Sequence, residues 1–460
     1  MIVYMDTQKN NGRRDFLRTG ALLGATVMAS PLSTFSSNSS SSSKPAILGG
    51  RSIWSDKQWP QWPRWNPETD ERRLLEVVRS GVWSRGRTTA EFEQKWAAMV
   101  GTDRSLAVVN GTNALATAIN SFGIGPGDEV LVPPYTFIAT VSAILFNGAM
   151  PVFVDVDPAT FQIDPRKMAA KITSKTKAIL PVHILGLPAD MDAIMAIAKQ
   201  HKLLVIEDAC QAHLAEYGGR KVGSIGHAGC FSFQNSKNLP IGEGGAITSN
   251  DQLFMDRCSS YHSYGLPAGS FNPLDTGMLG SKLRFTEYQA AIGLVMLERL
   301  QEETDVRHSN ATYLAAMISE IPGITPYQLY PKVDKGAFHL FPFRYDPSGF
   351  SGLSRDSFLT ALRAEGVPCS GGYVPLNTQP FIQASFNSPL FQQLYPGKDV
   401  DFQSFTEKNQ CPLNDKLCEE AVWLTQNMLL GPRTDMDEIA MAIGRIHHNA
   451  ADIVKSLPTN

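Results

Sequence analysis

Short apolar runs alternate with amphipathic stretches through the first two thirds of the chain. Runs of about four apolar residues, each bounded by polar or turn-forming residues, predict buried strands of a parallel sheet. The stretches between them repeat apolar residues at helical spacing and predict covering helices. The expected strands are 106–109, 129–132, 151–154, 178–182 and 203–206, and the clearest helices are 68–80, 114–122 and 191–201. This βαβ order predicts an α/β fold with a mostly parallel central sheet.

The pattern changes beyond about residue 300. A helix, a strand expected at 341–344, a Gly/Pro-rich loop and a closing helix expected at 435–449 predict a smaller α+β domain. A chain of 460 residues is long enough for more than one hydrophobic core. We therefore expect a signal and linker, a large domain and a small carboxyl-terminal domain, at residues 1–50, 51–300 and 301–460.

Composition narrows the class of protein. Hydrophobic residues make up 43% of the chain and charged residues 18%, which is ordinary for a globular enzyme. The net charge is -3 and the body of the chain has no dense run of Lys and Arg, so we expect no nucleic-acid partner. The six cysteines are scattered, without a CxxC pair or a matching His spacing, so we expect no metal site and no disulfide framework.

The amino terminus carries a different pattern. Arg13-Arg14 precedes a short apolar run at 19–30, which is typical of a twin-arginine export signal. The run is too short to cross a bilayer, since a spanning helix needs about 20 apolar residues. A serine tract at 36–43 predicts a linker. We expect a periplasmic or otherwise extracytoplasmic protein without a membrane span in its mature form; a cytoplasmic protein with a chance arginine pair is the alternative.

Lys237 follows an apolar strand and precedes a Gly-rich turn, in the segment FSFQNSKNLPIGEGG (231–245). A lysine held partly desolvated near a sheet edge has a lowered pKa and supplies the neutral amine that attacks an aldehyde. A solvated side chain or a phosphate contact is the alternative interpretation of the same pattern.

Two acids end an expected strand in LVIEDACQAH (204–213). Glu207 and Asp208 therefore lie at the carboxyl end of a parallel strand, where open α/β sheets bind their ligands. A buried carboxylate there needs a cationic partner, and the pyridinium nitrogen of pyridoxal 5'-phosphate (PLP) is one that makes the ring an electron sink. Gln211 on the following turn is placed to hydrogen-bond the ring hydroxyl. A helix cap is the alternative role for Asp208.

Gly111, Thr112 and Asn113 stand at an expected strand-to-helix junction. Free backbone N–H groups and the helix dipole favour an anion there, and Thr112 adds a hydroxyl donor. Together with Ser232 of the lysine segment, these donors suffice for one phosphate group. Phe137 follows the next strand and would bring a ring to stack on the pyridine, whereas core packing is the ordinary role of such a side chain.

On successive strands, the order of phosphate loop, aromatic ring, Asp and Lys matches the layout of a fold-type I PLP enzyme. From about Gly81 to Ile446 the chain closely resembles the DegT/DnrJ/StrS-type sugar aminotransferase family. The resemblance rests on NGTNALATAI, GIGPGDEVLVPPYTFIAT, PVFVDVDPATFQIDP, VIEDACQAH, FSFQNSKN with GEGG, and LRFTEYQAAIG.

The resemblance implies a role for each matching residue. Lys237 is implied as the Schiff-base lysine, Asp208 as the partner of the ring nitrogen and Gln211 as the partner of the ring hydroxyl. The implied phosphate contacts and stacking ring are Thr112, Asn113 and Ser232, and Phe137. The resemblance also implies a homodimer with active sites at the subunit interface.

The chain departs from the family pattern at Lys282. Many members have Asn in a G-x-N-x-R stretch that reaches the PLP phosphate of the neighbouring subunit, whereas this chain reads GSKLR at 280–284. An ammonium still binds a phosphate, as a point charge without the fixed geometry of an amide. Lys282 is therefore an expected cofactor contact, with a surface lysine as the alternative.

The expected activity is transfer of an amino group from glutamate or glutamine to a keto-sugar or keto-cyclitol by a ping-pong mechanism. Family dehydratases resemble the aminotransferases but carry histidine in place of the lysine, so Lys237 favours transfer. A dehydratase, and a non-catalytic sensor or binding protein that kept the fold, are the alternatives. Substrate contacts are expected in the loops 261–278 and 371–377, and His339 has no assigned role.

Overall fold

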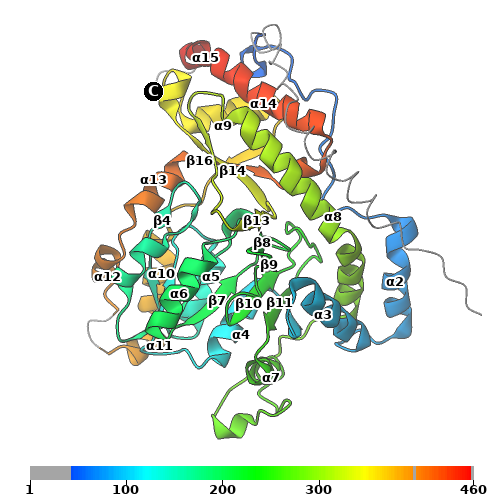
Figure 1. Cartoon of the computed structure of the whole chain (residues 1–460), viewed down its shortest axis with the longest axis vertical. Helices are drawn as coiled ribbons and strands as arrows, with labels where there is room; N and C mark the ends of the chain where they lie inside the picture. The colour runs from blue at the N-terminus through cyan, green and yellow to red at the C-terminus, as the bar shows by residue number, and fades with distance from the viewer. Residues whose placement is uncertain (1–42, 397–399, 457–460) are drawn as a thin grey trace, which may run out of the picture. The chain divides into compact units, whose positions relative to one another are not determined.

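The computed structural model, which describes residues 43–396 and 400–456, is built around a seven-stranded sheet (Figure 1). The strand order is β1-β11-β10-β7-β6-β2-β3, in which β11 is antiparallel to both neighbours and the other pairs are parallel. The strands are β1 (Arg104–Val108), β2 (Glu129–Val132), β3 (Met150–Phe153), β6 (Thr176–Ile179), β7 (Leu204–Asp208), β10 (Ala228–Ser232) and β11 (Gly245–Ser249). The predicted α/β fold with a mostly parallel sheet is confirmed.

Both faces of this sheet are buried. In β2, the side chains of Val130 and Val132 join one hydrophobic cluster and that of Leu131 joins another, and all three are inaccessible to solvent. A strand covered on both sides must be apolar at every position, which explains why the sequence shows short apolar runs instead of alternation.

Helices supply the other side of each cluster. The first cluster receives apolar side chains from α4 (Gly111–Ser121), α5 (Ile138–Phe146) and α7 (Gln252–Tyr261). The second receives them from α3 (Arg87–Val100), α6 (Met191–His201) and the first half of α8 (Glu287–Ile318). The sheet is thus a layer between two layers of helices.

The ends of α2 (Pro67–Ser80) show why the expected helix at 68–80 forms where it does. The Asn66 side chain accepts a hydrogen bond from the Glu68 N–H, and proline stands at the first helical position. Gly81 ends the helix in the left-handed conformation, with φ of 70°. Local capping chemistry therefore sets both boundaries.

Glu287, the first residue of α8, holds the start of α3. Its carboxylate accepts hydrogen bonds from the backbone N–H groups of Gly86, Thr88 and Thr89 and from the Thr89 hydroxyl, at 2.7 to 2.8 Å. Burial alone would raise the pKa of Glu287, but these hydrogen bonds lower that pKa to about 2. The ionised side chain thus joins two helices that are far apart in sequence.

A second, four-stranded antiparallel sheet follows in the last third of the chain. Its order is β12-β14-β16-β15, with β12 (Ile324–Pro326), β14 (Leu340–Tyr345), β15 (Cys369–Gly371) and β16 (Ala421–Thr425). The expected strand at 341–344 lies within β14, and the expected closing helix is α14 (Arg433–His448). Helix α9 (Arg355–Ala364) packs beside β15, and α14 packs beside α9.

Helix α8 connects the two sheets. Leu294 and Leu297 in its first half lie in the second cluster, whereas Leu314 and Ile318 near its end lie in the first, and the helix contacts β12 of the smaller sheet. The helix runs without a break through residue 300, and Lys44–Asn460 forms one compact unit. The division into domains at 51–300 and 301–460 stays a prediction.

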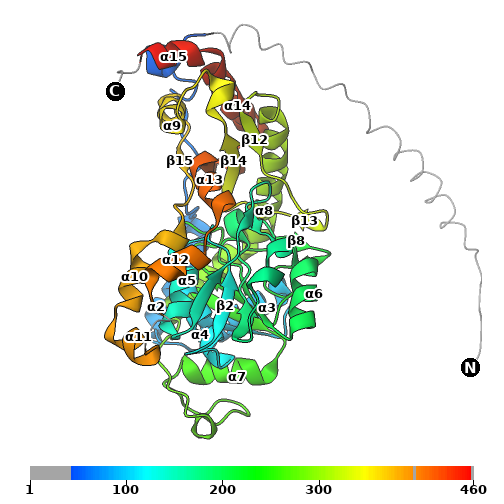
Figure 2. The same cartoon turned by 90° about the vertical axis from the view of Figure 1, so that its left-hand side faces the viewer.

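Short helices from the last third of the chain lie beside the large sheet (Figure 2), and residues on and after them contact β3 and the turn before it. The Tyr395 hydroxyl donates to the Gly148 carbonyl at 2.6 Å, and the Phe405 ring packs edge-on against Phe153 of β3. The remaining elements are α10 (Pro380–Phe386), α11 (Pro389–Leu394), α12 (Phe402–Lys408), α13 (Pro412–Glu420), α15 (Ala450–Ser456), β4 (Val156–Asp157), β5 (Gln162–Ile163), β8 (Glu216–Tyr217), β9 (Arg220–Lys221) and β13 (Val333–Lys335).

Residues 44–65, called the strap below, run along α9 and α14. The Glu365 carboxylate at the end of α9 accepts hydrogen bonds from the Ala46 N–H at 2.8 Å and the Ile53 N–H at 3.1 Å. Arg445 of α14 donates to the same carboxylate at 3.1 Å. A buried carboxylate thus fixes the strap to two helices.

In the part of the chain that the structure describes, no helix has both the length and the apolar character needed to cross a bilayer. The arginine pair at 13–14, the apolar run at 19–30 and nearly all of the serine tract at 36–43 lie outside the described residues. The export signal stays a prediction.

Candidate active site

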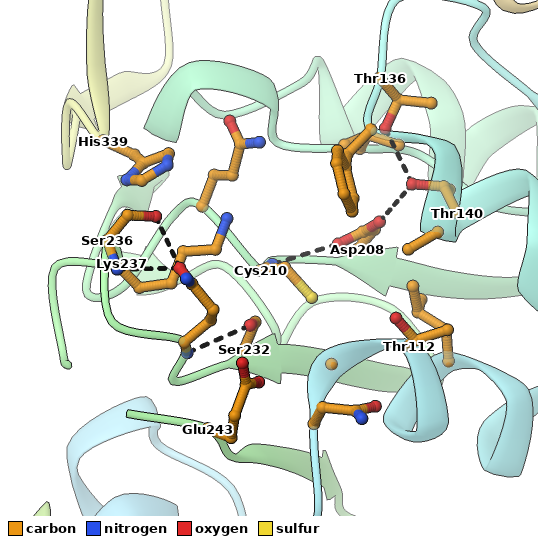
Figure 3. Close-up of a pocket in the computed structure, with 18 of the residues that line it drawn as sticks. Thr112, Thr136, Thr140, Asp208, Cys210, Ser232, Ser236, Lys237, Glu243 and His339 are labelled. Atoms are coloured by element: carbon orange, nitrogen blue, oxygen red, sulfur yellow. Dashed lines mark hydrogen bonds between the residues drawn. The ribbon is translucent and has the colours of Figure 1, made fainter. Parts of the chain in front are cut away.

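The ends of β1, β2, β6, β7 and β10 lead to one edge of the large sheet, where the residues that end or follow these strands line a cavity of about 520 Å³ (Figure 3). Strand β1 runs in the same direction as β10 because both are antiparallel to β11. The residues with a predicted role that line this cavity are Gly111, Thr112, Phe137, Asp208, Gln211, Ser232 and Lys237. The fold therefore brings together segments that are more than a hundred residues apart.

Helix α4 presents its amino-terminal end to the cavity. The Asn110 side chain caps the helix by accepting a hydrogen bond from the Asn113 N–H at 2.9 Å. The backbone N–H groups of Gly111 and Thr112 have no acceptor among the described residues. Two backbone donors and the positive end of the helix dipole therefore point at the cavity, as an anion site requires.

Gly111 allows this helix end to lie against the sheet. A Cβ atom at this position would lie 2.7 Å from Ser232 Cβ and 2.9 Å from Cys210 Sγ, closer than packed atoms can approach. The same side of the cavity holds the Ser232 hydroxyl, which is nearly buried. The absence of a side chain at position 111 thus sets how near the free N–H groups lie to Ser232.

Asp208 ends β7 as a buried carboxylate, with 4% of its surface exposed. Its Oδ2 accepts a hydrogen bond from the Thr140 hydroxyl at 2.8 Å, and its Oδ1 accepts one from the Cys210 N–H at 3.1 Å. No Lys or Arg side chain among the described residues forms an ion pair with it. A buried carboxylate with neutral donors only retains a strong preference for a cation.

Glu207 points away from the cavity, because successive side chains of a strand face opposite sides. Its carboxylate accepts hydrogen bonds from the N–H groups of Gly223, Ile225 and Gly226, at 2.6 to 2.7 Å, and pairs with His183 Nε2 at 2.9 Å. These partners satisfy the carboxylate completely. Glu207 therefore holds the loop before β10, and Asp208 alone of the two acids faces the cavity.

Lys237 sits in a tight turn after β10. Its backbone N–H donates to the Gln234 carbonyl at 2.8 Å, and the Gln234 side chain accepts from the Ser236 N–H and hydroxyl. Burial lowers the pKa of the Lys237 amine, against the smaller opposing effects of Cys210 and Asp208. The amine forms no hydrogen bond or ion pair with a described residue. It is thus available to react, with more of it unprotonated at a given pH.

Gln211 joins the large sheet to the smaller one. Its Oε1 accepts a hydrogen bond from the Leu185 N–H at 2.8 Å, and its Nε2 donates to the Tyr373 hydroxyl at 2.9 Å. Tyr373 follows β15 and lines the cavity. The second N–H of Gln211 is left for a ligand.

Phe137 stands immediately before α5 at the mouth of the cavity. Its side chain is 56% exposed, so core packing, the alternative role, does not apply. An exposed ring beside the crevice is consistent with stacking on a flat ligand.

Two residues with predicted roles do not reach the cavity. The Asn113 side chain donates to Asn110 Oδ1 at 2.9 Å and does not line the cavity, so its contact holds the cap of α4. Lys282 is exposed on a loop, where its backbone forms an isolated antiparallel β-bridge with Ser263. It does not line the cavity either. Within one chain, neither residue contacts a ligand bound there.

Three features of the cavity were not expected from the sequence. They are the helix cap formed by Asn110, the hydrogen bond from Thr140 to Asp208 and the position of Cys210. Cys210 lies close to both Asp208 and Lys237, and burial raises the pKa of its thiol. Asn110 follows a strand and precedes a helix, so the cap could have been predicted. The Thr140 contact has no local signal.

The residues present fit PLP. The free end of α4 with Ser232 suits a phosphate, Asp208 suits a protonated ring nitrogen, and Lys237 suits an aldehyde. A cavity of about 520 Å³ has the volume of ordinary cofactor sites.

The chain matches known proteins over most of its length. Residues 66–443 match the model of the DegT/DnrJ/EryC1/StrS aminotransferase family. The chain is 35% identical to a putative L-glutamine:3-amino-2,3-dideoxy-scyllo-inosose aminotransferase of Streptoalloteichus tenebrarius, over 88% of this chain and 98% of that protein. It is 37% identical to the spore coat polysaccharide biosynthesis protein SpsC of Bacillus subtilis, over 68% of this chain and 83% of that protein.

A solved structure shares the fold. The crystal structure of 3-amino-5-hydroxybenzoic acid synthase is 31% identical in sequence and superposes with a TM-score of 0.74. The superposition covers 87% of this chain and 99% of that one. The likeness extends over both sheets.

Replacing Gly111 with Ala is expected to weaken PLP binding at least about tenfold, because the new methyl group displaces the start of α4 from Ser232 and Cys210. Spectroscopic titration with PLP measures the affinity. Gly444→Ala is the matched control, since a Cβ atom at Gly444 of α14 meets nothing within 4 Å. Unchanged affinity in G111A would show that the close approach of α4 is not needed.

Proposed function

This chain belongs to the DegT/DnrJ/EryC1/StrS aminotransferase family, whose members depend on PLP, and we propose that it moves an amino group from glutamine or glutamate to a ketone on a sugar or cyclitol ring by a ping-pong mechanism. The observation that carries the proposal is that one cavity holds both an unengaged, half-buried lysine, Lys237, and a buried carboxylate without an ion-pair partner, Asp208. A binding protein has no need of either group.

Bound PLP supplies an aldehyde and an electron-withdrawing ring. We assign Asp208 to hold a proton on the ring nitrogen, since its carboxylate is buried and turned to the cavity by Thr140 and the Cys210 N–H. The free N–H groups at the start of α4, Thr112 and Ser232 would bind the phosphate.

Lys237 is assigned two tasks, binding the aldehyde and moving a proton at Nζ. Burial lowers its pKa, so the amine gives up and takes back a proton more readily at neutral pH. The rest of the wall carries no second amine among the described residues that line the cavity. Lysine at this position, where the dehydratases carry histidine, supports transfer.

Names of relatives support a cyclitol acceptor and a glutamine donor. One relative, 33% identical, is an L-glutamine:scyllo-inosose aminotransferase of Streptomyces griseus, and another, 34% identical, is an L-glutamine:2-deoxy-scyllo-inosose aminotransferase. scyllo-Inosose is therefore the first ketone to test.

A homodimer is part of the proposal. The loop after α7 carries Lys282 and extends away from the sheet in both views (Figures 1 and 2). On this loop, Leu274 and Leu279 are 86% and 87% exposed. Trp83, which precedes α3, and Phe137, which precedes α5, are also exposed. Apolar side chains so exposed favour contact with a second copy, which would bring Lys282 to the partner's phosphate site.

We also propose export by the twin-arginine route, supported by Arg13-Arg14 and the apolar run at 19–30. Nucleotide-linked sugars are cytoplasmic. An exported enzyme would therefore act on free cyclitols or unlinked keto-sugars.

Wild-type protein supplied with PLP is expected to show the absorbance band of lysine-bound cofactor, to lose it with L-glutamine and to regain it with scyllo-inosose. Lys237→Ala should lack the band and lose at least about a thousandfold in activity. Lys199→Ala on α6, an exposed lysine, is the control. Absence of the band in the wild type would refute the proposal.

Lys237→Ala and Lys282→Ala are each expected to be nearly inactive alone but to complement one another when co-expressed. Half of the randomly formed dimers are mixed and each has one intact site, so activity should reach about a quarter of the wild-type value. Activity no greater than the sum of the two separate variants would rule out a shared site.

Cell fractionation with Arg13→Lys/Arg14→Lys as the comparison tests export. The wild type is expected outside the cytoplasm, shortened at its amino terminus, and the double variant inside with its full length. A wild type that is wholly cytoplasmic and intact would dismiss the export proposal.

A further inference from the structure

His339 enters the cavity from the four-stranded sheet, immediately before β14. The segment that carries it is held on two sides. The Asn238 side chain, next to Lys237, donates to the Ala337 carbonyl at 2.7 Å, and the Ala337 N–H donates to the Gly186 carbonyl at 2.8 Å. The position of His339 is thus fixed to the lysine turn.

The backbone around His339 is unusually constrained. Phe338, just before it, has φ of 49°, in the left-handed region that a bulky residue rarely adopts. A Cβ atom at Gly186 would lie 2.7 Å from the backbone nitrogen of His339, so only glycine permits this approach. Strain of this kind persists where the surrounding structure enforces it, and it concentrates at functional sites.

The ring of His339 has one nitrogen to offer the cavity. Its Nδ1 is fully buried and has no hydrogen-bond partner. Its Nε2 also forms no hydrogen bond with a described residue, but this atom is not fully buried. Burial, followed by the charges of Lys237, His213 and Arg307, lowers the pKa of His339 well below its ordinary value. The ring is therefore neutral and carries a single N–H.

The position of that proton follows from burial. A buried N–H without a partner is rarer and less favourable than a buried lone pair without one. The proton therefore resides on Nε2, which lies on the cavity side. No hydrogen bond joins His339 Nε2 to any described residue, so His339 presents to the cavity a donor that no described protein group uses.

We propose that His339 is a specificity-determining residue whose Nε2–H donates a hydrogen bond to a hydroxyl oxygen of the ketone acceptor. The inference rests on the proposed transfer to a ring ketone and adds the group that recognises the ring. A donor that stays neutral selects an uncharged ligand with hydroxyl oxygens. A ring that lacks the matching oxygen binds more weakly, because the N–H of His339 is then left without an acceptor.

The test compares His339→Leu, which removes the donor, with His339→Gln, which keeps an N–H of similar reach. The two half-reactions are followed separately by the cofactor spectrum, with L-glutamine and with scyllo-inosose. In H339L, the concentration of scyllo-inosose that gives half the maximal rate should rise about tenfold to a hundredfold. The same constant for L-glutamine should change less than about twofold, and H339Q should recover most of the loss.

Titration with PLP checks that each variant retains the fold of the site. The PLP affinity of each variant should match that of the wild type. The inference is overturned if H339L leaves the scyllo-inosose constant unchanged, if it weakens L-glutamine instead, or if H339Q is no better than H339L. A wild type that reacts with L-glutamine but with no ring ketone would overturn the proposed function itself, which is a distinct outcome.

Discussion

The buried, unpaired carboxylate of Asp208 is the constraint on which the cavity depends. A parallel strand delivers the side chain to the sheet edge, and Thr140 with the Cys210 N–H orients both of its oxygens. These donors are neutral and provide no positive charge, so the carboxylate still favours a cationic partner in the cavity. Asp208 is near enough to affect the pKa of Lys237, but the two side chains form no ion pair, so the Lys237 amine is not engaged by the carboxylate.

The sequence predicted the parts of the fold that local pattern determines. The bounds of β2 and α6 agree residue for residue with the expected 129–132 and 191–201, because polar residues and caps mark their ends. Gly111, Asp208 and Lys237 were predicted together because each lies at the carboxyl end of a strand or shortly after it, and the carboxyl ends of parallel strands share one edge. The sheet order, with β11 inserted antiparallel between β1 and β10, had no such signal.

Contacts that depend on distant segments could not be predicted. Thr140 donates to a residue 68 positions away, and nothing near Thr140 in the sequence indicates that partner. Asn113 differs from its predicted role for the opposite reason: a residue close in sequence, Asn110, accepts hydrogen bonds from its backbone N–H and from its side-chain Nδ2. His339 and Tyr373 come from the four-stranded sheet, whereas Asp208 and Lys237 come from the large one. The residues proposed for chemistry and the residue proposed for ring recognition thus come from different sheets, which α8 connects.

The strap lies outside the match to the family model but inside the compact folded unit. The family match begins at residue 66, yet the Glu365 carboxylate is satisfied by Ala46 and Ile53, and the Trp59 indole donates to the Gly366 carbonyl at 2.9 Å. A chain trimmed to residue 66 would keep every group assigned to the reaction but would leave a buried acid short of donors. For recombinant expression, the natural starting point is therefore Lys44, where the compact unit begins.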